Sequence, residues 1–110
     1  MESKIRKLLL SLGVDPSLSG YDYLVDAVAI CYEDRTYLRM VTKKLYPYIA
    51  KKNNSTMSKV ERAMRVAIEK SPEMCPEVYE KLILLPPTDK GKYTNSQFIG
   101  ACVEQLRMER

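Results

Sequence analysis

The chain has 110 residues, of which 45% are hydrophobic and 29% are charged, and its formal net charge at pH 7 is +4. This balance is typical of one soluble globular domain and excludes an intrinsically disordered chain. No apolar run approaches the roughly 18–20 residues of a membrane span, and no signal-peptide cleavage site follows Leu8-Leu9-Leu10, so we expect a cytoplasmic protein without membrane contact.

The side chains that most enzymes use are scarce. The chain has no histidine, and its cysteines, Cys31, Cys75 and Cys102, form no CxxC motif. Without histidine, the usual general base for a serine or cysteine nucleophile is missing. A zinc site would need all three thiolates and a carboxylate. We therefore expect buried, reduced thiols and a protein that is not an enzyme, with no catalytic residues, no metal and no cofactor.

Helical periodicity organises the first half of the chain. Apolar residues spaced by three and four predict a helix over 3–12. A second predicted helix, over 20–33, is apolar on most sides, which is typical of a central helix. Residues 36–45 predict a third helix. Pro47 favours a fourth over about 47–53, because proline suits the first turn of a helix.

The next helix is predicted over 58–70 and is strongly amphipathic. Ser58 and Glu61 have the spacing of a capping box, which would start this helix, and the Ser71-Pro72 pair would end it.

The last part of the chain is less regular. Residues 72–93 contain a predicted short helix and a proline-rich loop. Thr94 and Gln97 form a second capping-box pattern that opens a final helix over about 95–109. No segment has strand periodicity, so we expect an all-α fold with about six helices.

Positive charge is concentrated in one quarter of the chain. Residues 43–70 hold eight basic and two acidic side chains, a segment charge of +6, whereas the rest of the chain sums to −2. A local basic patch on an otherwise acidic domain is typical of a protein that binds a polyanion.

Residues 46–65 fit the pattern of a helix-turn-helix. Ala50 supplies the small residue where the two helices approach, and Asn54 occupies the turn, where a left-handed conformation is needed. The second helix of such a unit enters the major groove of DNA. The predicted base-reading residues are Ser58, Lys59, Glu61, Arg62, Arg65 and Val66. The predicted phosphate-binding residues are Lys51, Lys52, Asn54 and Thr56.

Two other interpretations stay open at this point. The basic face of 58–70 could be an ordinary solvated helix surface, in which Glu61 and Arg65 form an i,i+4 pair. The chain could also be a stand-alone helical protein-interaction module, or an antagonist of a related regulator, whose basic face meets an acidic partner. A fragment of a nucleic-acid enzyme is a remote third option.

Three separated motifs narrow these alternatives. They are YPYIAKKNNST at 46–56 followed by SKVERAMR at 58–65, GYDYL at 20–24, and TNSQFI at 94–99. Together they resemble the DNA-binding effector domain of the stage zero sporulation protein A family, the master response regulators of sporulation. The resemblance covers nearly the whole chain and is weakest at about 71–92.

This resemblance implies a six-helix effector domain with a helix-turn-helix and without a winged helix. It further implies binding to double-stranded DNA at a TGTCGAA-like box, activation or repression of transcription, and contact with the RNA polymerase sigma subunit. Tandem homodimers would form on DNA through the C-terminal helix 95–109. By position, Lys59, Glu61 and Arg62 would read bases, with help from Arg65.

The chain differs from the family pattern at three positions. Lys59 stands where arginine is usual, Val66 where histidine is common, and Asn53 where an aromatic residue is common. The third difference predicts altered packing below the turn. In the family, a receiver domain of α/β structure precedes this domain. Such a receiver does not fit into 110 residues whose pattern predicts only helices. We therefore expect a single domain over 1–110, either an excised fragment or a free-standing relative.

Overall fold

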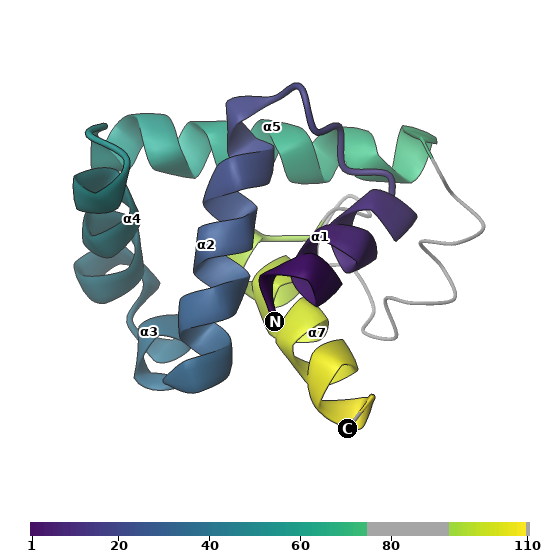
Figure 1. The fold of residues 1–110 in the computed structure, drawn as a ribbon. Coiled ribbons are helices and arrows are strands. Elements are labelled where there is room, and N and C mark those ends of the chain that lie inside the picture. Colours follow the sequence, from purple (N-terminus) through teal and green to yellow (C-terminus); the bar gives the residue numbers. More distant parts are fainter. Residues whose placement is uncertain (75–92, 110) are drawn as a thin grey trace.

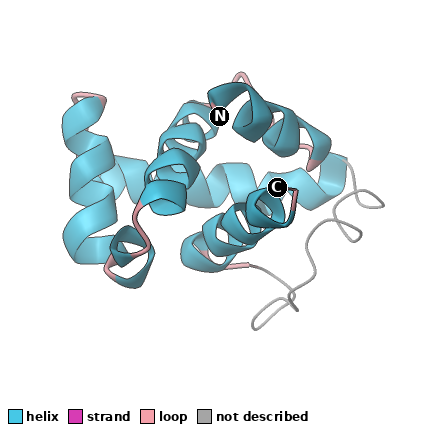
Figure 2. Cartoon of the chain, turned by 60° about the horizontal axis from the view of Figure 1, so that its bottom comes forward, coloured by secondary structure: helices cyan, strands magenta, loops and turns pink. Residues whose placement is uncertain are grey.

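The computed structural model describes residues 1–74 and 93–109, with the backbone only at 72–74, and these residues form helices joined by short connections (Figures 1 and 2). The elements are α1 (Glu2–Ser11), α2 (Ser19–Glu33), α3 (Thr36–Arg39), η1 (Val41–Leu45), α4 (Tyr46–Lys52), α5 (Met57–Met74) and α7 (Asn95–Met108). The predicted all-α class is confirmed. The short helix and the proline-rich loop predicted within 72–93 lie outside the described residues.

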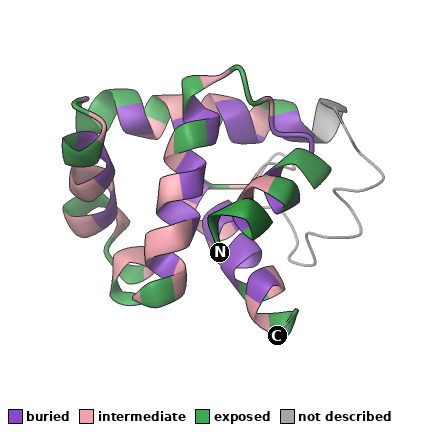
Figure 3. Ribbon diagram, in the orientation of Figure 1, coloured by how far each residue is buried: buried purple, intermediate pink, exposed green. Residues whose placement is uncertain are grey.

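Helix α2 is the centre of the fold. It packs against α1, α5 and α7, with α4 on one side and α1 on the other (Figure 1). Leu24, Ala27 and Val28 on α2 are fully buried, as are Phe98 and Ile99 on α7. Figure 3 shows the resulting pattern, in which buried residues turn toward α2 and exposed residues form the outer surface. The predicted central helix is thus confirmed.

Gly20 lets α2 lie directly on α5. A Cβ atom at this position would be 2.2 Å from the backbone oxygen of Ala63 and 2.9 Å from the Cβ of Ala67. Real Cβ atoms do not approach a backbone oxygen so closely, so only glycine fits here. This close contact fixes the position of α5 against the central helix α2.

The helix predicted over 36–45 is interrupted at Met40, where φ is −125° and ψ is 57°. The carbonyl of Met40 then accepts hydrogen bonds from the backbone N–H of Lys44 at 2.7 Å and of Leu45 at 3.2 Å. The second of these is the wider bond of a π-helix, so Val41–Leu45 forms one π-helical turn. The prediction of a single helix was wrong, although Leu45 at the end of this range is fully buried.

Helix α5 begins one residue before its predicted start and is capped differently. The Thr56 hydroxyl accepts a hydrogen bond from the backbone N–H of Lys59 at 3.2 Å, which places Thr56 at the N-cap. Ser58 therefore lies inside the first turn, and the Glu61 carboxylate pairs with Arg65 instead of closing a capping box. The predicted Ser58–Glu61 capping box was wrong.

Substitution of the two hydroxyl residues should separate these assignments. Thr56→Ala removes the cap and should lower the free energy of unfolding by about 1 kcal/mol. Ser58→Ala should change it by less than about 0.5 kcal/mol, because alanine is the better helix former inside the first turn. Urea denaturation of both variants measures the difference, and a larger loss for Ser58→Ala would contradict the observed start of α5.

Helix α5 also continues past its predicted end at Ser71-Pro72 and reaches Met74. Proline lacks a backbone N–H, so Pro72 leaves the carbonyl of Ile68, four residues earlier, without its usual donor. The buried Ser71 hydroxyl donates to that carbonyl at 2.8 Å. A side chain thus replaces the missing backbone bond, and the helix does not stop.

Helix α7 begins as predicted. The Thr94 hydroxyl accepts from the backbone N–H of Gln97 at 3.1 Å, and the Gln97 side chain accepts from the backbone N–H of Thr94 at 3.1 Å. This reciprocal pair is a capping box, which satisfies two backbone donors at the helix start. The helix ends at Met108, one residue before its predicted end.

Two of the three thiols lie in the core. Cys31 and Cys102 are fully buried and unpaired, as predicted, whereas Cys75 lies outside the described residues. Burial raises the pKa of the Cys31 thiol to about 12 and also raises the pKa of Cys102. Both thiols therefore stay protonated at neutral pH. Separately, none of the helices in 1–74 and 93–109 has the length and apolarity that a membrane crossing requires.

Candidate nucleic-acid interface

Helices α4 and α5 are joined by a tight turn. The backbone of Asn54 has a φ of 51°, the left-handed conformation that was predicted for this position. This conformation brings the N–H of Ser55 to 2.8 Å from the carbonyl of Ala50, which closes the C-terminal end of α4. Asparagine is one of the few residue types that adopt this left-handed backbone conformation without large strain. The predicted helix-turn-helix geometry is therefore present.

One side of α5 is buried. Val60, Met64, Ala67 and Ile68 are at most 2% exposed and pack into the core, as the apolar periodicity predicted. Ala63 is half-buried, because the first turn of α2 covers it at Gly20. Helix α5 is held along its length, so its outer side chains project from a fixed support.

The other side of α5 carries the predicted base-reading residues. At 100° per residue they share one arc of the helix, about 160° wide. Ser58, Lys59, Arg62 and Arg65 are exposed, whereas Glu61, at one edge of the arc, and Val66, between Arg62 and Lys59 around the helix, are partly buried. The structure therefore brings all six onto one face. We call these six residues the α5 arc.

Charged groups on the α5 arc differ in their availability. The Arg65 guanidinium contacts the Glu61 carboxylate at 3.2 Å, so these two side chains are already paired. Such an exposed i,i+4 pair is weak and exchanges readily for another partner. Within the described part of the chain, Lys59 and Arg62 form no ion pair. These two cations are free to donate to a ligand.

A shallow hollow of about 360 Å³ lies beside the α5 arc, between α5 and the start of α2. Its lining includes the apolar side chains of Leu18, Tyr23 and Val66 next to the charged Lys59 and Arg62. Val66 thus contributes an apolar surface between two cations. This arrangement suits a ligand that carries both methyl groups and hydrogen-bond acceptors.

The four predicted phosphate-binding residues occupy the end of α4 and the turn, and only some are unengaged. Lys51 is exposed, and so is Asn54 in its left-handed conformation. Thr56 caps α5 with its hydroxyl. The Lys52 ammonium lies 3.1 Å from a carboxylate oxygen of Asp26, and this hydrogen bond raises the pKa of Lys52.

Asn95, which the sequence did not single out, supports the α5 arc from behind. Its side-chain amide donates to the Tyr46 hydroxyl at 3.0 Å and to the backbone carbonyl of Glu61 at 3.1 Å. Asn95 is only 7% exposed, and burial raises the pKa of Tyr46. One amide therefore ties the starts of α4, α5 and α7 together.

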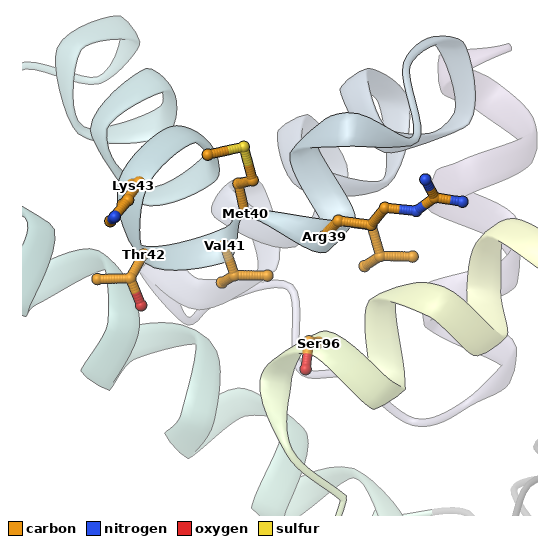
Figure 4. A pocket seen from close by; sticks show the side chains of 7 residues that line it. Arg39, Met40, Val41, Thr42, Lys43 and Ser96 are labelled. Atoms are coloured by element: carbon orange, nitrogen blue, oxygen red, sulfur yellow. The ribbon is translucent and has the colours of Figure 1, made fainter.

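A larger hollow of about 530 Å³ lies away from the α5 arc, where α3 and η1 meet the start of α7. Its lining includes Arg39, Met40, Lys43 and Ser96. Figure 4 shows the Arg39 and Lys43 side chains pointing to opposite sides of the hollow. Its two cations therefore do not converge on one ligand, and the α5 arc remains the better site.

The fold and the α5 arc together define a helix-turn-helix DNA-binding domain, since an exposed, cationic second helix is the element that such domains place in the major groove. Residues 5–106 match the family model described as the C-terminal domain of the sporulation initiation factor Spo0A. The chain belongs to this family, and the predicted resemblance is confirmed. It is therefore a DNA-binding domain of a sporulation transcription regulator.

Proposed function

We propose that this domain binds duplex DNA at a TGTCGAA-like box through the α5 arc. The observation that supports this most strongly is the position of Arg62, which is exposed, free of any described ion pair and central in the arc. The +6 charge of residues 43–70 would supply the attraction to the phosphate backbone, which is independent of sequence.

Five of the six side chains of the arc have a matching chemistry on the DNA. Arg62 and Lys59 donate to O6 and N7 of guanine, and Glu61 accepts from N4 of cytosine. Arg65 assists after release from Glu61, and Val66 contacts a thymine methyl group. Lysine in place of arginine at position 59 replaces a rigid fork with a single ammonium group, so base discrimination there should be lower.

Replacement of Arg62 tests this assignment. Arg62→Ala should weaken binding to the selected box by about 1–3 kcal/mol, roughly 5- to 150-fold in Kd, and relax specificity at one base pair. Fluorescence anisotropy with a panel of single-base variants measures both effects. Arg39→Ala, at an exposed arginine outside the arc, is the matched control. Equal binding by Arg62→Ala and the wild type would show that the arc is misplaced.

The box itself is found by in vitro selection from random duplex DNA. A TGTCGAA-like consensus supports the family site, whereas a shifted consensus points to Lys59 and Val66. We further propose that two copies pair in tandem on DNA through α7 and that the domain contacts the RNA polymerase sigma subunit; the support for both is family membership. A gel-shift series in salt separates sequence-specific DNA binding from an adaptor function, which predicts no sequence preference at moderate salt.

A further inference from the structure

The carboxylate of Asp26, in the middle of α2, holds two consecutive residues of the helix-turn-helix. One oxygen accepts from the Lys52 ammonium at 3.1 Å, and the other accepts from the Asn53 side-chain amide at 3.0 Å. The Asp26 side chain is only 18% exposed. A partly buried carboxylate with a partner on each oxygen is a fixed group, and it attaches the end of α4 to the central helix.

Asn53 makes this attachment a structural part of the turn. Its side-chain nitrogen also donates to the carbonyl of Ile49 at 2.9 Å, in the last turn of α4. One amide group therefore closes the end of α4 and contacts α2 at the same time. The next residue, Asn54, adopts the left-handed conformation that directs the chain into α5. Asp26 thus helps to set where α5 begins relative to α2.

Lys52 gives the same carboxylate a second consequence. The Lys52 side chain is 53% exposed, so its ammonium group remains accessible to a ligand while it contacts Asp26. A DNA phosphate at this position would have to share the ammonium with the carboxylate or displace it. Lys51, the preceding residue, is exposed and forms no ion pair within the described residues. A phosphate that contacts Lys52 must therefore compete with Asp26, whereas one that contacts Lys51 meets no ion-pair partner among the described residues.

We propose that Asp26 is a positioning residue of the DNA-binding unit that also restrains its affinity, because it competes with a backbone phosphate for Lys52. This inference rests on the proposed DNA-binding function and adds an internal regulator to it. Asp26 holds the turn through Asn53 and lowers the effective charge of the interface through Lys52. Loss of its charge alone should then strengthen DNA binding without moving the turn.

Asp26→Asn is the informative variant, because the amide oxygen can still accept from Asn53 while the negative charge is removed. Kd on the selected box is measured between 50 and 200 mM salt. We expect tighter binding at 50 mM and a slope of log K against log salt that is steeper by about 0.9, the value for one added phosphate contact. The advantage over the wild type should then fall roughly threefold across this range.

Two controls separate this effect from a general change in charge. Asp22→Asn removes the same charge from an exposed position on α2, one turn earlier, and should leave the slope unchanged. In a Lys52→Ala background, Asp26→Asn should no longer steepen the slope. An equal slope change in Asp22→Asn, or one that persists without Lys52, would overturn the proposal.

A further comparison does not depend on the folding of Asp26→Asn. With Asp26 present, Lys51→Ala should reduce the salt slope by about 0.9, and Lys52→Ala should reduce it by clearly less. Equal reductions by the two lysine variants would overturn the restraint. Failure of the proposed function has a different signature, since the wild-type domain would then show no sequence preference at any salt concentration.

Discussion

Gly20→Ala should destabilise the domain by about 3 kcal/mol, the upper part of the range for overpacked cores. The added Cβ would lie 2.2 Å from the backbone oxygen and 2.8 Å from the carbonyl carbon of Ala63. Backbone atoms in the middle of a helix cannot rotate away as a side chain can, so α2 and α5 would have to separate. For a domain of this size, thermal unfolding should show a melting temperature roughly 10–20 °C lower.

Gly100→Ala is the matched control for this prediction. A Cβ at position 100 would lie 3.4 Å from the Cδ2 of Leu38, an ordinary contact with a side chain that can adjust. Alanine is also about 1 kcal/mol better than glycine inside a helix, so this variant should melt at or above the wild-type temperature. Similar melting of both variants would mean that α2 and α5 are less closely packed than described.

Asn95→Asp should have a comparably large effect, a loss of about 3 kcal/mol in the free energy of unfolding. The substitution replaces an N–H donor with a carboxylate oxygen that faces the backbone carbonyl of Glu61. Two acceptors would then oppose each other at a site that is 7% exposed, where the charge is poorly solvated. Urea denaturation at neutral pH measures the loss.

Tyr46→Phe isolates one arm of the same network. It removes only the hydroxyl that accepts from Asn95 and leaves the bond to Glu61 in place, so about 1 kcal/mol should be lost. If Asn95→Asp costs no more than Tyr46→Phe, the contact between Asn95 and the carbonyl of Glu61 does not support α5 as described. Near-equal values would therefore contradict the role given to Asn95.

The helices were largely predictable because each has a continuous apolar face. The ranges 3–12, 20–33, 47–53 and 95–109 each start and end within about one residue of the observed helices, since burial against a common core selects the same periodicity. The break at Met40 was not predictable in this way. A π-helical turn keeps Leu45 in the core, and its occurrence depends on the packing of the whole chain.

The start of α5 shows how two local patterns compete. The hydroxyl of Thr56 can cap the backbone N–H of Lys59, and the hydroxyl of Ser58 could cap that of Glu61. The sequence alone favoured Ser58, because Glu61 completes the pattern of a capping box. The left-handed Asn54 decides otherwise, since it turns the chain into helical geometry by Met57. The turn and the cap are therefore one unit.

The composition of the α5 arc followed from helical spacing alone. The engagement of Lys52 did not, because Asp26 lies twenty-six residues earlier in the chain and on another helix. Asn95 was missed for the same reason, since its partners at positions 46 and 61 are distant in sequence. Spacing predicts which residues share a face, and only the tertiary structure shows which of them already have partners.

The hydroxyl of Ser71 and the missing N–H of Pro72 have a consequence for how this sequence can change. With proline at position 72, the Ser71 hydroxyl is the side-chain donor to the carbonyl of Ile68, and its loss leaves a buried acceptor unsatisfied. With any other residue at position 72, the backbone itself would supply that donor. The effect of replacing Ser71 therefore depends on the residue at position 72. Replacement of Pro72 first makes the serine hydroxyl dispensable, whereas replacement of Ser71 first destabilises the domain.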